Sequence, residues 1–282
     1  MPYRLANVAG RAALVAGDGY YDLAALSNGA LGPDPMAAIA ACDRLHALSA
    51  GLADREPTGS LADAELGSPV PSPRNSFAVG LNYATHVAES GMETPAAPVI
   101  FSKFPSCIVG PDADIALNSA FGDYEAEVVV VIGAGGANIA AADVWMHVAG
   151  ITGGQDISDR NLQFAATPAH FDLGKSRDTY GPVGPVLVSP DSFDDPDDIA
   201  LACRVNGEER QRSSTARLIF SVPYLVEYLS AALTLAPGDL IFTGTPDGVG
   251  VTSGTFLVDG DEIVTEIAGV GTLTNRCVGG AS

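Results

Sequence analysis

The stretch Asp123-Tyr-Glu125-Ala-Glu127 runs directly into Val128-Val-Val-Val-Ile132-Gly133, and the rest of the chain is best understood from this junction. Five successive β-branched residues ended by glycine predict a buried strand. Side chains alternate faces along a strand, so Glu125 and Glu127 should point the same way at its entrance. Two adjacent carboxylates beside apolar residues need a shared proton or a cation. Oxygen ligands favour Mg²⁺ or Mn²⁺ before Zn²⁺; the alternative is an edge strand with two solvated glutamates.

Composition and charge narrow the class of protein. At 282 residues, with 47% hydrophobic and 17% charged residues, the chain should form a soluble globular protein with a sizeable core. Its net charge of −20 argues against unassisted binding to nucleic acid or anionic membranes, because the electrostatic term has the wrong sign. An acidic substrate would need cations supplied locally, and the chain has only two lysines, Lys103 and Lys175.

Cysteine spacing and the apolar segments favour a cytoplasmic protein. The cysteines are far apart and form no Cys-x-x-Cys motif, as is typical of a reducing compartment (Cys42, Cys107, Cys203 and Cys277). Arg4 and Arg11 precede any long apolar run, so we expect no signal peptide. Polar residues interrupt the most apolar region, 128–151, so we expect no membrane span there.

The sequence divides into a small N-terminal α/β domain over residues 1–70 and a catalytic domain over residues 71–282. Within the first, Arg11–Ala16 and Gly19–Leu23 predict a hairpin, and Pro35–Leu48 predicts a helix. Three prolines between residues 69 and 73 mark a linker.

His86 and Glu89 form a candidate catalytic pair. They lie three residues apart, so on a helix they share one face. A carboxylate that holds an imidazole makes a general base able to take a proton from water. The same spacing also occurs on ordinary solvated helix faces, so the pair alone decides nothing.

Other stretches predict strands and polar loops. Short strands are expected at Phe77–Gly80 and Val99–Lys103, and Asn206-Gly207 suits the turn of a hairpin that begins at Leu201. An amphipathic helix is expected over Thr215–Leu233, and Asp261–Ile267 should be the last strand. Many strands and few long helices indicate an α+β, mostly β fold.

Three loops have both a functional and an ordinary interpretation. The Gly-rich turn after the central strand fails the dinucleotide-binding fingerprint, because Asn138 replaces its third glycine. Asp156 is either a third carboxylate ligand or, with Ser158, a candidate helix cap. The Gly-rich segment 243–250 either holds a carboxylate through free backbone N–H groups or is a plain connection.

The ordered motifs resemble the fumarylacetoacetate hydrolase family, in its acylpyruvase-like, diketo-acid hydrolase branch. The similarity covers roughly Phe77 to Arg276, and the matching segments are Gly-Leu-Asn82-Tyr-Ala-Thr-His86, Asp-Tyr-Glu125-Ala-Glu127, Gln-Asp156-Ile-Ser-Asp-Arg160-Asn-Leu-Gln163, Gly-Lys175-Ser and Gly-Asp-Leu-Ile-Phe-Thr-Gly-Thr245-Pro. The resemblance implies a mixed β-sandwich or β-roll, a Mg²⁺ or Mn²⁺ site with Ca²⁺ as a further candidate, and a homodimer.

The resemblance also implies roles for single residues. It makes Glu125, Glu127 and Asp156 the metal ligands and gives catalysis to His86, Glu89 and Lys175. Substrate contacts would come from Lys103, Arg160, Gln163 and Thr245. Two positions depart from the family pattern: Gln155 stands where Asn is usual, which should alter only the surroundings of the ligands. Arg177 stands where an aromatic residue is common, and we interpret it as an extra cation for an acidic substrate tail.

These roles predict an enzyme that cleaves a C–C bond of a 2,4-dioxo acid of the acylpyruvate, fumarylpyruvate or fumarylacetoacetate type. Water activated by the His86–Glu89 pair would attack the distal carbonyl, and a metal-stabilised enolate would leave. The alternative is a decarboxylase or isomerase of 2-oxo dicarboxylates, such as oxaloacetate or 2-hydroxyhepta-2,4-diene-1,7-dioate, at the same metal site. A metal-dependent binding protein without turnover is the third hypothesis.

Overall fold

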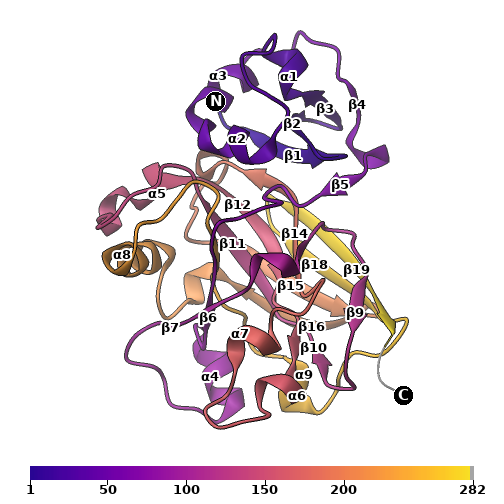
Figure 1. The fold of residues 1–282 in the computed structure, drawn as a ribbon, viewed down its shortest axis with the longest axis vertical. Coiled ribbons are helices and arrows are strands. Elements are labelled where there is room, and N and C mark those ends of the chain that lie inside the picture. The colour runs from indigo at the N-terminus through magenta and orange to yellow at the C-terminus, as the bar shows by residue number, and fades with distance from the viewer. Residues whose placement is uncertain (280–282) are drawn as a thin grey trace.

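The computed structural model describes residues 1–279, which form a mostly β architecture around a large mixed sheet (Figure 1). The main path of that sheet runs β4-β3-β2-β1-β14-β12-β11-β17-β6-β7, with β5 paired to β1 and β8 paired to β14. Its strands are β1 (Arg4–Val8), β2 (Arg11–Ala16), β3 (Gly19–Asp22), β4 (Gly59–Ser60), β5 (Leu66–Gly67), β6 (Ser76–Gly80), β7 (Val99–Ser102), β8 (Ile108–Val109), β11 (Ala126–Ile132), β12 (Val148–Gln155), β14 (Gly181–Val188) and β17 (Leu240–Phe242).

A second sheet of five strands packs against the first, as the predicted sandwich requires. Its order is β16-β15-β18-β19-β9, and one buried cluster joins Val128 and Ile151 of the large sheet to Cys203 and Ile263 of the small one. Its strands, and those of a separate two-stranded ribbon, are β9 (Ile115–Leu117), β15 (Ala200–Val205), β16 (Glu208–Ser214), β18 (Glu262–Ile267) and β19 (Gly271–Gly279), then β10 (Gly122–Asp123) and β13 (Ser158–Asp159).

The central strand is confirmed, with an interruption at its entrance. Every residue of β11 is buried, and β11 pairs antiparallel with both β12 and β17. The stretch from Asp123 does not run unbroken into this strand, because the N–H of Tyr124 donates to the Asp123 side chain and that of Glu125 donates to Gln155 (2.8 and 2.9 Å). The strand therefore kinks where the carboxylates sit.

The small sheet corrects one prediction and confirms another. Asp261–Ile267 is not the last strand, because β19 follows it and pairs with β18 and β9. Only Leu273, Asn275 and Cys277 are buried in β19, so its apolar signal is weak. The predicted hairpin of β15 and β16 is present, and Asn206 and Gly207 both have positive φ (52° and 79°), as a type I′ turn requires.

The N-terminal segment forms a lobe at one end of the molecule, but its sheet is continuous with the rest (Figure 1). β1 pairs antiparallel with β14, where Leu5 lies opposite Leu187. The predicted hairpin of β2 and β3 is present. The helix predicted over Pro35–Leu48 is split at Ala41, and the lobe's helices are α1 (Leu23–Leu26), α2 (Pro35–Ala40) and α3 (Cys42–Ser49). The division at residue 70 stays a prediction.

The remaining helices fall into two groups. α4 (Ala84–Ser90), α6 (Arg160–Gln163), α7 (Phe171–Gly174) and α9 (Gly250–Ser253) gather at the end opposite the N-terminal lobe (Figure 1). α5 (Val144–His147) and α8 (Val222–Ala232) lie on one side. The helix predicted over Thr215–Leu233 is wrong in its first part, because α8 begins only after Ser221, whose hydroxyl accepts from Tyr224 N–H, with a proline in the first turn. No helix within residues 1–279 has the length and apolar character that crossing a membrane requires.

Candidate active site

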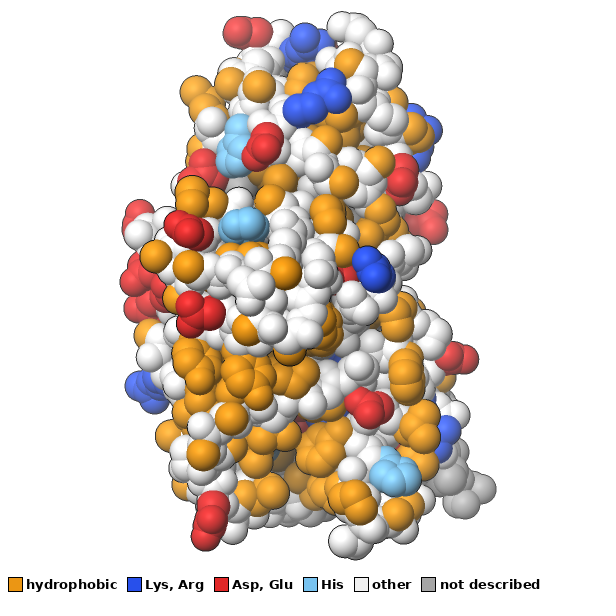
Figure 2. Space-filling view, turned by 60° about the vertical axis from the view of Figure 1, so that its left-hand side comes forward, with side chains coloured by type: hydrophobic (Ala, Val, Ile, Leu, Met, Phe, Trp, Pro, Cys, Tyr) orange, Lys and Arg blue, Asp and Glu red, His pale blue; other side chains and the backbone are white. Residues whose placement is uncertain are grey.

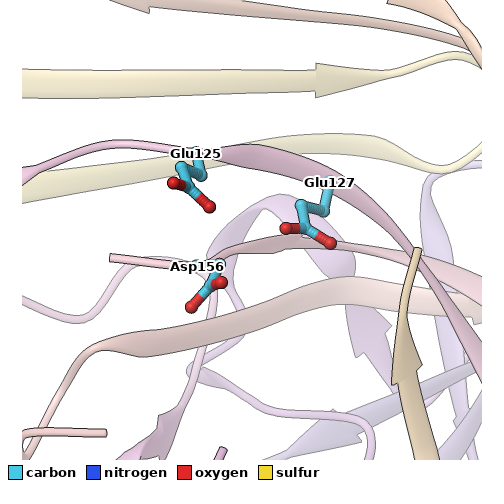
Figure 3. A group of neighbouring side chains, drawn as sticks. All are labelled: Glu125, Glu127 and Asp156. Atoms are coloured by element: carbon cyan, nitrogen blue, oxygen red, sulfur yellow. The ribbon is translucent and has the colours of Figure 1, made fainter. Parts of the chain in front are cut away.

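Three buried carboxylates meet where β11 begins and β12 ends (Figure 3). Glu125, Glu127 and Asp156 each offer one oxygen, and these oxygens all lie within 4.8 Å of one another. Strand alternation puts the two glutamates on one face, and Asp156 N–H donates to the Glu125 carbonyl (2.8 Å), which sets the third acid beside them. The structure thus brings together the three predicted ligands.

Basic side chains neutralise two of these acids but not the third. Glu125 pairs with Arg160 and Lys175 (both 2.6 Å), and Asp156 pairs with Lys103 and Lys175 (2.7 and 2.9 Å). Burial opposes ionisation of Glu125, but the charges of Lys175 and Arg160 outweigh it and lower its pKa. Among the described residues, Glu127 receives one hydrogen bond, from Gly244 N–H (2.6 Å). Burial, followed by the negative charges of Asp156 and Glu125, raises the pKa of Glu127 well above its usual range.

The donor set fits a hard divalent cation. The charge of the cation would compensate Glu127, because no basic side chain among the described residues pairs with it. The three carboxylates also supply the oxygen ligands that Mg²⁺ and Mn²⁺ prefer. The Tyr83 hydroxyl is buried without a hydrogen-bond partner, and its pKa is raised by burial and then by the charge of Glu127. An orphaned hydroxyl beside the acids is consistent with a coordination shell that brings further oxygen atoms.

We expect metal binding to release a proton from Glu127. Its raised pKa means that, below that value, Glu127 is protonated in the metal-free protein, whereas a ligand must be ionised. Metal affinity should therefore rise with pH until the pH passes the raised pKa. Titration calorimetry with Mg²⁺ or Mn²⁺ at mildly acidic pH can be run in two buffers that differ in ionisation enthalpy. The difference between the two binding heats, divided by the difference between the ionisation enthalpies, should correspond to about one proton released per ion. Equal heats in both buffers would contradict this assignment.

The His86–Glu89 pair is formed on α4, as predicted. His86 Nδ1 lies 2.7 Å from Glu89 Oε1, while Glu89 Oε2 accepts from Gly248 N–H and the Thr252 hydroxyl (both 3.0 Å). Burial opposes the ionised form of Glu89, but these hydrogen bonds, that of His86 first, lower its pKa. An ionised Glu89 only accepts, so Nδ1 carries the proton and Nε2 is left as the base.

A cavity of about 160 Å³ is lined by His86 of this pair and by Glu125 of the carboxylate cluster, whereas Glu89, Glu127 and Asp156 are not in its lining. It brings together most of the predicted site residues, namely His86, Glu125, Arg160, Gln163, Lys175 and Thr245. Two predicted substrate contacts lie elsewhere. Lys103 is fully buried behind Asp156, and Arg177 is held by Asp159 (2.7 Å), outside the cavity lining. The interpretation of Arg177 as a cation for a substrate tail therefore gains no support from its position.

Asp123 is a residue of this site to which the sequence analysis gave no role. Its side chain is fully buried and accepts from the N–H groups of Gly250 and Val251 (2.6 and 2.9 Å) and from Arg160 Nε (2.8 Å). It thus fastens the start of α9 and orients the arginine that pairs with Glu125. The alternation Asp123, Glu125, Glu127 was the available signal, because it continues the same strand face. The helix cap at α6 is Asp159, rather than Asp156 or Ser158.

Two buried glutamines hold the kink between the ligand residues. Gln155 accepts from Glu125 N–H (2.9 Å) and donates to Thr265 of β18 (2.8 Å), so it does act on the ligands' surroundings, as predicted. Gln211 accepts from Ala126 N–H (2.9 Å) and donates to the Thr245 hydroxyl (2.8 Å), which itself donates to the Ala126 carbonyl (2.9 Å). This closed ring commits the Thr245 hydroxyl to the backbone. Nothing in the charged sequence of β16 signals Gln211.

Gly244 completes the support of Glu127. Its φ is 106°, which L side chains rarely adopt, and a β-carbon there would lie 2.8 Å from the β-carbon of Asn82. Only glycine lets this backbone approach closely enough for its N–H to reach Glu127.

Comparison with known proteins agrees with this geometry. Residues 75–278 match the family model described as fumarylacetoacetate hydrolase, C-terminal. The chain belongs to this family. As an enzyme of the fumarylacetoacetate hydrolase family, it is 42% identical over 238 residues to a mitochondrial oxaloacetate tautomerase of Bos taurus, which covers 83% of this chain and 76% of the relative.

Two solved structures of the family resemble the chain along its whole length. An HpcE protein from Mycobacterium smegmatis is 46% identical with a TM-score of 0.93, and the match covers 98% of this chain and 99% of that one. Maleylpyruvate hydrolase from Sphingobium sp. SYK-6, in complex with manganese(II) ion and pyruvate, is 30% identical with a TM-score of 0.80 and covers 99% and 100%.

Proposed function

We propose that the chain is a metal-dependent enzyme that moves a proton at the carbon next to the 2-oxo group of a small 2-oxo acid. Interconversion of the keto and enol forms of oxaloacetate is the first reaction to test. The observation that carries the proposal is one cavity lined both by Glu125, a member of the carboxylate cluster that fits a divalent cation, and by a histidine with a free basic nitrogen. The similarity to the bovine oxaloacetate tautomerase supports this chemistry ahead of the diketo-acid hydrolysis that the motifs alone favoured.

Glu125, Glu127 and Asp156 would hold the cation. A bound divalent ion would supply Lewis-acid stabilisation of the negative charge that develops on an enolate.

The protein's own groups supply the proton transfer. His86 Nε2 takes the proton from the substrate carbon next to the 2-oxo group and delivers it to the 2-oxo oxygen, which gives the enol. Glu89 holds the imidazole ring in the tautomer that leaves Nε2 free for this transfer. Lys175 and Arg160 keep Glu125 ionised and add positive charge near the anion. All three N–H groups of Lys175 are already used by Glu125, Asp156 and Ser158, so it acts by charge rather than as a proton donor.

The second candidate is hydrolysis of a 2,4-dioxo acid. The same His86–Glu89 pair favours it, because a base beside the carboxylate cluster can also deprotonate water, and maleylpyruvate hydrolase has the same fold. Decarboxylation of oxaloacetate needs the same enolate stabilisation but no base.

The test uses chelator-stripped protein reloaded with Mg²⁺ or Mn²⁺. Ultraviolet absorbance follows the enol of oxaloacetate, coupled pyruvate detection reports decarboxylation, and loss of acetylpyruvate reports hydrolysis. We expect metal-dependent tautomerisation that His86→Asn slows by about 10² to 10⁴. His147→Asn, on α5, is the matched control and should leave the rate unchanged. Metal-dependent hydrolysis without tautomerisation would replace the first function by the second, and no turnover would favour a binding protein.

Assembly and location stay predictions. We propose a homodimer in the cytoplasm that acts on small oxo acids and not on nucleic acid or membranes; the bovine relative is named as mitochondrial.

A further inference from the structure

The cavity beside the carboxylate cluster is lined by a charged group of residues and by a larger apolar group. The charged and basic residues of the lining are Glu125, Arg160, Lys175 and His86, and Phe101 lies beside them, with Lys175 Nζ 5.4 Å from its ring centroid. The rest of the lining is mainly apolar (Val79, Leu81, Met92, Phe164, Ala169, Phe171 and Val251), and Met92 and Phe164, each 55% exposed, bring this apolar part to the surface of the molecule. Hydrophobic side chains gather over the lower half of the surface in Figure 2, at the height of α4, α6 and α7 in Figure 1.

The lysines near the cavity have no N–H group to spare. Lys175 donates to Glu125, Asp156 and Ser158 (2.6, 2.9 and 2.8 Å). Lys103 donates to Asp156 and to the carbonyl oxygens of Lys175 and Tyr180. An ammonium has three donors, so both are saturated.

The arginines are committed in the same way. Arg160 donates through Nε to Asp123, through one Nη to Gln163, and through the other to Glu125 and Asp123, which leaves one of its five N–H groups. Arg177 is paired with Asp159 and does not line the cavity. Among the described lining residues, no lysine or arginine stands in the apolar wall.

This distribution of charge selects between substrate tails. A carboxylate moved from water into an apolar wall without a partner is strongly disfavoured, whereas each buried methylene gains affinity. A four-carbon dicarboxylate keeps both charges near the ligand cluster and the remaining N–H of Arg160. A longer dicarboxylate would place its far charge beyond Phe101, against Phe164 and Phe171, which also line the cavity.

We therefore propose that the apolar wall is a subsite for an uncharged alkyl or aryl tail, so that the preferred substrates are 2-oxo monocarboxylates extended beyond the fourth carbon. This inference rests on the proposed 2-oxo-acid chemistry. It excludes seven-carbon dioates as good substrates and makes oxaloacetate the longest dicarboxylate that the cavity accepts well.

The test compares two six-carbon acids of equal length, 2-oxohexanoate and 2-oxoadipate, which differ in a methyl or a carboxylate at the far end. Calorimetry on the Mn²⁺-loaded protein measures both dissociation constants without requiring turnover. We expect 2-oxohexanoate to bind at least tenfold more tightly than 2-oxoadipate, and about tenfold more tightly than 2-oxobutyrate, which lacks two methylenes. Equal or tighter binding of 2-oxoadipate overturns the proposal, and so does binding of neither acid.

A charged substitution in the wall adds a second measurement. Phe164→Arg puts a cation at an exposed position and should shift the preference toward 2-oxoadipate by about two- to fivefold, the range of an exposed ion pair. Met146→Arg, at another exposed apolar position on α5 outside the cavity, is the control and should leave the preference unchanged. An unchanged preference in Phe164→Arg contradicts the proposed subsite. If the tail preference is observed but oxaloacetate is not tautomerised, the proposed function fails and the subsite stands.

Discussion

Glu127→Gln should abolish divalent-metal binding and lower turnover by about a thousandfold or more, because a bound metal ion contributes several kcal/mol to stabilising an enolate. In the metal-free protein the same change should not destabilise the fold. Glu127 is buried beside two other carboxylates, and its pKa in the folded protein is raised. Folding must then keep a proton that the unfolded chain releases, so the free energy of unfolding falls as the pH rises from the usual glutamate pKa toward the raised one. The isosteric amide removes that cost and keeps an acceptor for Gly244 N–H.

Glu125→Gln is the matched control, and its effect on stability should have the opposite sign. It also loses metal, but it leaves Arg160 and Lys175 without the carboxylate that pairs with both. Breaking a buried ion pair from one side typically costs about 3–5 kcal/mol. Urea unfolding in the presence of a chelator measures both variants. If Glu127→Gln proved as destabilising as Glu125→Gln, our assignment of the uncompensated charge to Glu127 would be wrong.

Asp123→Ala should lower the free energy of unfolding by about 3–5 kcal/mol, as expected when one partner of a buried ion pair is removed. The variant leaves the N–H groups of Gly250 and Val251 without their acceptor and removes one of the two carboxylates that hold Arg160. Because Arg160 also contacts Glu125, we expect metal affinity to fall in parallel, by about 10- to 100-fold.

Glu209→Ala provides the comparison for Asp123→Ala. Glu209 also pairs with arginine, through Arg212, but on the exposed edge of β16, where an ion pair contributes little. Thermal unfolding and a manganese titration should show no change in this variant. A similar, small effect of both substitutions would show that Asp123 does not anchor the site.

The ligand cluster could be predicted because it is encoded locally. Glu125 and Glu127 lie two residues apart at the entrance of β11, and Asp156 directly follows β12, the strand that pairs with β11. The His86–Glu89 pair needs only one helical turn. For these residues, short-range spacing already carries the spatial relation.

What the sequence did not reveal depends on long-range contacts. The kink at Tyr124 and Glu125 arises from hydrogen bonds to Asp123 and Gln155, whose burial requires the second sheet. The helix predicted from Thr215 failed because a capped start at Ser221 overrode an apolar pattern that extended beyond it. β19 was missed because most of its outward residues are polar, so its sequence has little apolar alternation. Its extended conformation depends on backbone pairing with β18, which its own sequence does not show.

Gln211 occupies the one fully buried position of β16, an edge strand otherwise made of charged and hydroxyl side chains. Its amide reaches across to the backbone between the two ligand glutamates. An outlying strand of the small sheet is thereby coupled to the centre of the molecule, and fraying of that edge on heating would release the cation before the large sheet begins to melt. Heat inactivation of this enzyme would then begin as demetallation, and excess ion in the medium would protect it.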